Sequence, residues 1–284
     1  MTRKRTYSPR GKSKRCLALT GLLGWVTPAM LCYAIWNNQE RTTLDTLKRL
    51  IDQGFLAEAY EKRQFGAGRP DRILFLTWTG MRYLVDHGFL PKPDIHYFWR
   101  GEGHEKPSYR RHEIEIRRVL ITFITHLRND PHGAIWLKSK SIRAEPSDTG
   151  NDTSPLQSGQ LLPDAVFAVR DGQSGQIKEC YAELDLATEN HEIWGSKISR
   201  YRQSPEVMDS AANVLVVASD EERMHQLMSW SQNTSPFLFS TLDKVCFSYQ
   251  RDGKKLRLIS PGDPLGKVWQ HCNDTRPRCL FAPL

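Results

Sequence analysis

The sequence predicts an α/β protein of the α+β class, in which a mainly helical first third precedes a part where helices and strands alternate. The chain has 284 residues, enough for two hydrophobic cores. Hydrophobic residues make up 39% and aromatic residues 10%, which is typical of a globular protein. Helical periodicity dominates up to about residue 90, and short apolar strands appear after residue 130. We therefore expect two domains of different architecture.

Positive charge is concentrated at the start of the chain. The first 100 residues hold 17 Lys and Arg against 8 Asp and Glu. Seven of these basic residues lie within residues 1–15, where no acidic residue occurs. We interpret residues 1–15 as a flexible basic arm that raises affinity for nucleic acid through counterion release. A solvated tail without a partner is the alternative.

Residues 16–90 are predicted to form a winged helix-turn-helix domain. A first helix covers residues 16–23 and ends at Gly24. Thr27 and Pro28 provide an N-cap and a first helical residue for the second helix, which runs to residue 36. The third helix, over residues 41–53, places Leu44 and Leu47 on one apolar face.

A wing is predicted after this third helix. A strand starts at residue 55, a glycine-rich basic tip covers residues 61–71, and a second strand returns over residues 72–77. A helix over residues 79–87 closes the domain. In helix-turn-helix proteins the second helix of the motif reads base edges while its flanks and the wing contact phosphates. The expected partner is double-stranded DNA, and a winged helix used for protein contacts is the alternative.

The residues expected to contact DNA come from the third helix and the wing. They are Arg41, Thr42, Thr43, Thr46 and Lys48 from the helix, and Lys62, Arg63, Arg69 and Arg72 from the wing.

The second domain is predicted to span residues 110–284, after a linker over residues 91–109. Its expected order is a helix over 110–127, a strand over 134–143, a hairpin from residue 163 to 186, a helix from about 189, a strand over 213–218 and a helix over 220–231. Residues 237–284 add strands that the sequence does not assign. The order is αβββαβ.

The hairpin carries three carboxylates that could act together. Asp164 opens its first strand, and Glu183 and Asp185 share one face of its second strand because side chains alternate. Like charges at this spacing are tolerated when water or a bound cation neutralises them. Three converging carboxylates would suit Mg²⁺, and the following helix places Lys197 near the same edge. Solvated surface charge is the alternative.

A metal, two or three carboxylates and a lysine are what phosphodiester cleavage requires. On that hypothesis Asp164, Glu183 and Asp185 are metal ligands, and Lys197 stabilises the developing charge. Mg²⁺ is expected only if the domain is catalytic.

These motifs resemble known families. Pro163-Asp164, the Glu183-x-Asp185 motif and a helix containing Lys197 are similar to the core of PD-(D/E)XK nucleases. More narrowly, the segments PDAVFAV, YAELDLATE and KISRY resemble bacterial replication-relaxation proteins. That resemblance implies an accessory factor of plasmid or conjugative-element replication or mobilisation, with a winged helix and a PD-(D/E)XK-like domain. Asp185 stands where the nuclease pattern has lysine, so a migrated lysine and a non-cleaving domain are both allowed.

Three functions are therefore compatible with the sequence. The first is a DNA-binding accessory protein, with a relaxase or replication protein as a further partner and a homodimer allowed. The second is a Mg²⁺-dependent DNA endonuclease, and the third is a winged-helix transcriptional regulator. The six cysteines show no zinc-ligand spacing and are expected to be reduced thiols of a cytoplasmic protein. Polar residues dilute the uncharged segment 16–39, so we expect no membrane anchor.

Overall fold

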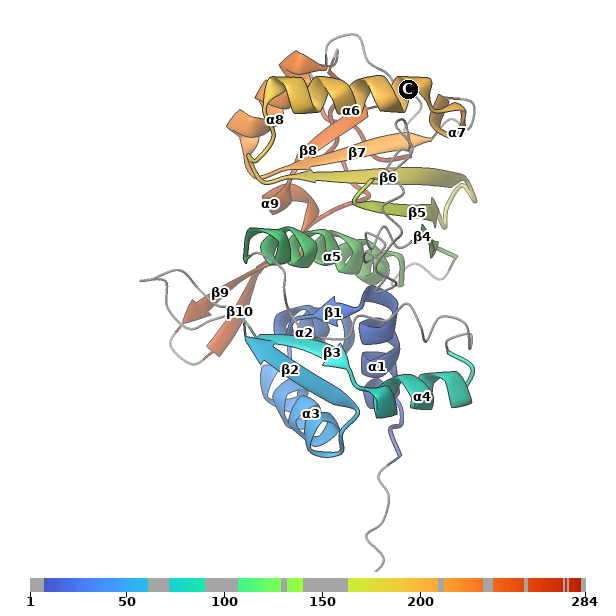
Figure 1. Ribbon diagram of the computed structural model, residues 1–284, viewed down its shortest axis with the longest axis vertical. Helices are drawn as coiled ribbons and strands as arrows, with labels where there is room; N and C mark the ends of the chain where they lie inside the picture. Colours follow the sequence, from blue (N-terminus) through green and yellow to red (C-terminus); the bar gives the residue numbers. More distant parts are fainter. Residues whose placement is uncertain are drawn as a thin grey trace, which may run out of the picture. The chain divides into compact units, whose positions relative to one another are not determined.

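The chain forms two units (Figure 1). In this computed structural model, unit 1 comprises Met1–Arg118 and Tyr249–Ile259, and unit 2 comprises Val119–Ser248 and Ser260–Leu284. The structure describes residues 8–60, 72–89, 107–128, 132–139, 163–208, 212–231, 237–252, 255–272, 274 and 276–281.

Over its described residues, unit 1 begins with four helices, and the three strands of a small antiparallel sheet lie between them in the sequence. Its sheet has the order β1-β3-β2. The elements in chain order are α1 (Lys12–Leu23), β1 (Trp25–Val26), α2 (Pro28–Trp36), α3 (Glu40–Asp52), β2 (Leu56–Tyr60), β3 (Arg72–Leu76) and α4 (Trp78–Asp86).

Local sequence explains where these helices begin and end. The Thr27 side chain accepts a hydrogen bond from the backbone N–H of Met30, so it caps α2 as predicted. Gly24 ends α1 with a φ of 78°, a conformation that favours glycine. Helix α1 begins at Lys12, earlier than the predicted residue 16, because nothing after Gly11 interrupts it. Part of the predicted basic arm is therefore helical.

Helix α3 buries a face shifted by one residue from the predicted one. Thr43, Leu47 and Leu50 are buried, whereas Leu44 is 39% exposed. The Thr43 hydroxyl donates to the Gln39 carbonyl, which satisfies it inside the unit. Thr43 therefore faces the core of unit 1, and its neighbours Thr42 and Leu44 lie on the exposed face of α3.

Unit 2 is built on a five-stranded mixed sheet of order β4-β5-β6-β7-β8. Strands β4, β5 and β6 pair antiparallel, whereas β6, β7 and β8 pair parallel. The elements are α5 (Pro107–Arg128, in this unit from Val119), β4 (Ala134–Ser139), β5 (Ala165–Arg170), β6 (Ile177–Asp185), α6 (His191–Gln203), α7 (Pro205–Met208), β7 (Asn213–Ala218), α8 (Glu221–Trp230), β8 (Phe237–Thr241) and α9 (Leu242–Val245).

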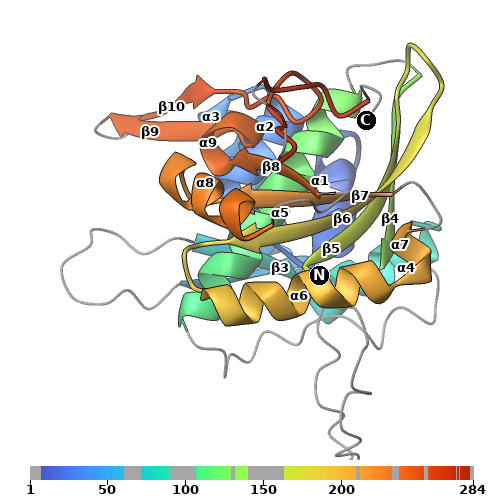
Figure 2. The same ribbon diagram turned by 90° about the horizontal axis from the view of Figure 1, so that it is seen from above.

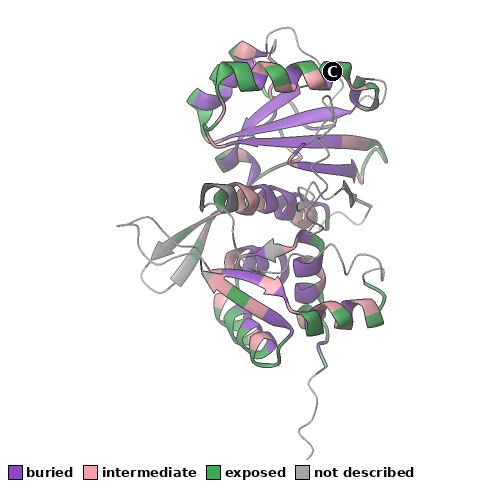
Figure 3. Ribbon diagram, in the orientation of Figure 1, coloured by how far each residue is buried: buried purple, intermediate pink, exposed green. Residues whose placement is uncertain are grey.

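Helices cover both faces of this sheet (Figures 1 and 2). Helices α6 and α8 pack on one face, where Trp194 and Leu227 join the core with Val214 and Val216 of β7. The final part of α5 packs on the other face, where Phe123 contacts Phe167 at 5.0 Å between ring centroids. All six residues of β7 are buried, as the purple central strands of Figure 3 show. The mixed α/β class and the predicted order of elements are confirmed.

A second strand pair follows α9. Strands β9 (Ser248–Asp252) and β10 (Lys255–Ser260) form a two-stranded sheet, and residues Tyr249–Ile259 belong to unit 1. Just beyond it, Gly262 has a φ of 68°, and a Cβ there would lie 2.4 Å from the Val245 carbonyl oxygen. Only glycine allows this approach. The sequence had left this region unassigned within the second domain.

In the described ranges, no helix is both long and apolar enough to span a membrane. The predicted linker lies outside those ranges up to residue 106. All six cysteines are free.

Two helical glycines provide a matched test of the packing. A Cβ on Gly80 of α4 would lie 2.2 Å from the Phe55 backbone oxygen, whereas a Cβ on Gly195 of α6 meets nothing within 4 Å. We expect Gly80→Ala to destabilise the protein by about 1–3 kcal/mol, because backbone must move. We expect Gly195→Ala to stabilise it by about 0.5–1 kcal/mol through helix propensity. Urea unfolding measures both, and equal effects would contradict the packing described.

Candidate functional site

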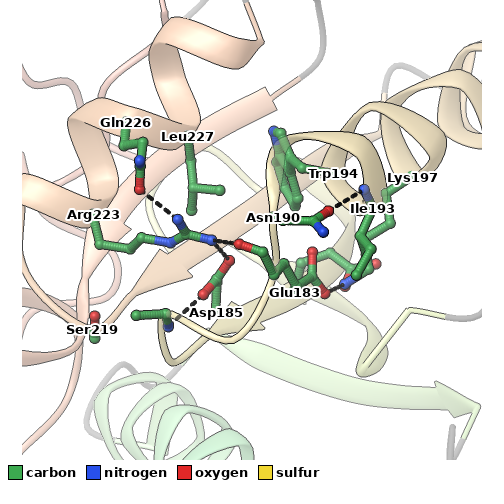
Figure 4. A network of polar contacts seen from close by, with 12 residues as sticks. Glu183, Asp185, Asn190, Ile193, Trp194, Lys197, Ser219, Arg223, Gln226 and Leu227 are labelled. Atoms are coloured by element: carbon green, nitrogen blue, oxygen red, sulfur yellow. Dashed lines mark hydrogen bonds and ion pairs between the residues drawn. The ribbon is translucent and has the colours of Figure 1, made fainter.

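The candidate site is a network of buried charges on strand β6 (Figure 4). Glu183 and Asp185 are each only 2% exposed. They lie on the same face of β6 as Tyr181, as alternation predicts, and this face is covered by α6 and α8. An ionised carboxylate in such a place must be paired, because its desolvation is costly.

Glu183 is bound by two side chains of α6. Its Oε2 lies 2.7 Å from Lys197 Nζ, and its Oε1 accepts a hydrogen bond of 2.6 Å from the Tyr201 hydroxyl. Lys197 and Tyr201 are four residues apart, so they project from the same side of the helix. Burial raises the pKa of Glu183 to about 7, against the opposing effect of Lys197.

Lys197 bridges two carboxylates. Its Nζ also lies 2.5 Å from Glu189 Oε1, in the segment that leads into α6. Burial alone would lower the pKa of Lys197, but the attraction of Glu183, Asp164 and Glu189 outweighs this and raises it. Lys197 therefore links α6 to strand β6 through Glu183 and to the segment before α6 through Glu189.

Asp164 lies beside this pair at the start of β5. Its Oδ2 accepts a hydrogen bond of 2.8 Å from the Leu184 backbone N–H. Its negative charge adds to the burial that raises the pKa of Glu183 and to the attraction that raises the pKa of Lys197. The structure thus brings together Asp164, Glu183 and Lys197.

Asp185 is held by a different helix. Its Oδ2 lies 2.7 Å from a guanidinium nitrogen of Arg223 on α8, and its Oδ1 accepts a hydrogen bond of 2.5 Å from the Ala187 N–H. Ala187 has a φ of 62°, unusual for a residue with a side chain, so the turn folds back onto Asp185. Two neighbouring carboxylates of one strand therefore have separate cations.

Arg223 connects α8 to the turn before α6. Besides Asp185 it donates to the Glu189 carbonyl and to Gln226, and its guanidinium lies 5.0 Å from the ring centroid of Trp230. Figure 4 shows the guanidinium between Gln226 and Asp185. The β6 carboxylates thus fix both helices that cover this face.

The expected Mg²⁺ ligand set does not fit these contacts. Both oxygens of Glu183 and both of Asp185 accept hydrogen bonds from protein donors. In the part of the chain that the structure describes, no three or more His, Cys, Asp or Glu side chains form a group that could hold a metal ion. In the structure Asp185 is paired with Arg223, whereas Glu183 is paired with Lys197 beside Asp164.

Three contributors to the network were not predicted from the sequence. Tyr201 could have been found, because it lies one helical turn after Lys197 and faces the same way. Glu189 precedes that helix and was noted only as its approximate start. Arg223 had no local signal, because only the parallel pairing of β6 with β7 brings α8 over Asp185.

The predicted DNA-contacting residues divide into four groups. Arg41, Thr42 and Lys48 are exposed on α3, and Thr46 is half-buried there. Thr43 is a correction, because it is only 1% exposed and faces the core of unit 1. Arg72 of β3 is described and pairs with Glu58. The predictions for Lys62, Arg63 and Arg69 lie outside the described residues.

The fold and these motifs define a two-unit protein of mixed α/β architecture with a buried acidic strand. A model of the family described as Replication-relaxation matches residues 28–213, which is well over half of the chain. The chain belongs to the replication-relaxation family. No curated protein and no solved structure matches it.

The buried ion pair on α8 can be compared with an exposed one on the same helix. Arg223→Met would leave Asp185 buried without its cation, and we expect a loss of about 3–5 kcal/mol in the free energy of unfolding. Lys244→Met removes the partner of Glu221 at the exposed start of α8, and we expect a change within about 0.5 kcal/mol. Chemical denaturation measures both. A loss below about 1 kcal/mol for Arg223→Met would contradict the assigned role.

The raised pKa of Glu183 predicts a pH dependence of stability. Between its usual 4.5 and about 7, the folded chain holds a proton that the unfolded chain has released. The contribution of Glu183 to the free energy of unfolding therefore falls as pH rises through this window and is level above it. Glu183→Gln removes this titration, so wild type should lose on the order of 2 kcal/mol more than the variant between pH 5 and pH 8.

The control is Glu192→Gln, which changes an exposed carboxylate on α6, the helix that supplies Lys197 to Glu183. Its pH profile should follow wild type. Parallel profiles for wild type and Glu183→Gln would show that Glu183 does not titrate in this window.

Proposed function

We propose that this protein is a DNA-binding accessory factor of plasmid or integrative-element replication or mobilisation, acting in the cytoplasm. The observation that carries the proposal is helix α3, whose outer face presents Arg41, Thr42 and Lys48 while Thr43, Leu47 and Leu50 hold it in the core. Membership of the replication-relaxation family supports a role of this kind.

The order of elements in unit 1 supports a winged helix. Helices α2 and α3 are joined by residues 37–39, of which Asn37 and Asn38 have positive φ, and the antiparallel pair β2–β3 follows. In this arrangement α3 is the recognition helix, with its N-terminal residues at base edges and Lys48 further along. The predicted partner is double-stranded DNA.

For unit 2 we propose a scaffold with a nuclease-like order of elements and no cleavage. The support is the pairing of Glu183 with Lys197 and Tyr201 and of Asp185 with Arg223, which uses the carboxylates to hold helices. Such a unit would organise DNA or bind a relaxase or replication protein.

A Mg²⁺-dependent endonuclease is the second candidate. One observation favours it: Asp164, Glu183 and Lys197 do converge, as the resemblance to PD-(D/E)XK nucleases predicts. It differs from the first candidate in requiring DNA cleavage that depends on a divalent cation and on Glu183. Among the described residues of unit 2, no contact favours the third alternative, a ligand-sensing regulator.

DNA binding is tested by fluorescence anisotropy with duplexes from the locus that encodes the protein. We expect the double variant Arg41→Ala/Thr42→Ala to raise the Kd for its preferred duplex at least tenfold, because base contacts contribute about 1–3 kcal/mol each. Arg82→Ala is the control, since it removes an exposed charge of unit 1 that lies on α4. Absence of binding by wild type, or equal binding by all three proteins, would contradict the proposal.

A further inference from the structure

The strand pair β9–β10 joins unit 1, although it follows β8 and α9 of unit 2 in the sequence. Tyr249 anchors it there. The Tyr249 hydroxyl donates a hydrogen bond to Asn38 Oδ1, which lies in the turn between α2 and α3. A segment more than 200 residues away in sequence thus binds the turn that precedes the proposed recognition helix.

The surroundings of the Tyr249 ring confirm this position. Burial raises the pKa of Tyr249, and Cys32 and Tyr33 of α2 and Glu40 of α3 raise it further. Cys32 is also buried, which raises the pKa of its thiol, and the side chains of Thr43 and Tyr249 oppose this rise. These partners come from the end of α2 and the first turn of α3. The tyrosine therefore fixes β9 at the N-terminal end of α3.

The hairpin is basic. Residues 248–260 contain four Lys or Arg and one acidic residue. Arg257 of β10 is exposed. Positive charge on a strand pair that is bound beside the N-terminal end of α3 would suit contact with phosphates, which carry one negative charge per about 1.7 Å of duplex.

We propose that the β9–β10 hairpin is a second DNA-contacting element, which binds the phosphate backbone of double-stranded DNA beside α3. This inference rests on the proposed function of unit 1. The hairpin contributes affinity and orientation, whereas sequence is read by α3, because phosphate contacts carry no base information. Tyr249 acts as a positioning residue that holds the hairpin against the α2–α3 turn.

The test compares two double variants that remove the same charge. Arg251→Ala/Arg257→Ala changes the hairpin, and Lys267→Ala/Arg276→Ala removes two exposed charges of unit 2. Kd is measured for two unrelated duplexes at salt concentrations from about 50 to 200 mM. The hairpin variant should weaken binding to both duplexes by a similar factor, about three- to tenfold. The slope of log Kd against log salt should fall by about one to two.

The control variant should keep the wild-type slope. Tyr249→Phe should weaken binding in the wild-type background and add nothing in the Arg251→Ala/Arg257→Ala background, because both changes then act through one element. A purely structural role for Tyr249 would add the same loss in both backgrounds.

The outcomes separate this inference from the function on which it rests. If wild type binds neither duplex, the proposed function fails and the inference fails with it. If Arg41→Ala/Thr42→Ala weakens binding but the hairpin variant keeps the wild-type Kd and slope, only the hairpin proposal is overturned. Since Arg257 is exposed, its substitution should leave the thermal unfolding midpoint unchanged, which a melting curve verifies.

Discussion

Two buried carboxylates on one face of strand β6 constrain the whole of unit 2. Glu183 and Asp185 are two residues apart, so they emerge side by side, and neither could remain ionised in the core without a cation. Helix α6 supplies Lys197 to the first and helix α8 supplies Arg223 to the second. The packing of both helices follows from this pairing. Trp194 of α6 then donates a hydrogen bond to Ser231 at the end of α8, which joins the helices directly.

In our proposal the pairing of Glu183 and Asp185 with protein cations gives unit 2 a structural role, and unit 1 contacts DNA. Protein donors occupy both oxygens of Glu183 and both of Asp185, which supports a structural role for the network in the scaffold we propose. DNA contact is assigned to unit 1, where α3 presents its polar face. Residues Tyr249–Ile259 belong to unit 1 although unit 2 precedes and follows them in the sequence, so in our proposal the DNA-binding surface includes a segment from late in the chain.

Secondary-structure elements could be predicted from the sequence better than the contacts between side chains of different elements. Alternation along β6, the Thr27 cap and the limits of β7 follow from local chemistry, and the structure has them as predicted. The helix predicted after the hairpin also placed Lys197 near the edge that carries Glu183. Arg223 and Tyr249 could not be predicted, because their partners depend on strand pairing and on a return of the chain to unit 1. Thr43 was misplaced because leucines suggested an apolar face one residue away, and only packing reveals the face that is buried.

The central claim is that the β6 network is structural and that the protein binds DNA without cleaving it. The most direct measurement is incubation with supercoiled plasmid carrying the encoding locus, in Mg²⁺, in Mn²⁺ and in EDTA, for wild type and Glu183→Gln. Matched gels would report retardation and nicking. We predict retardation by wild type in every buffer, without nicking. Nicking that requires a divalent cation and is lost in Glu183→Gln would contradict this account and make the protein an endonuclease.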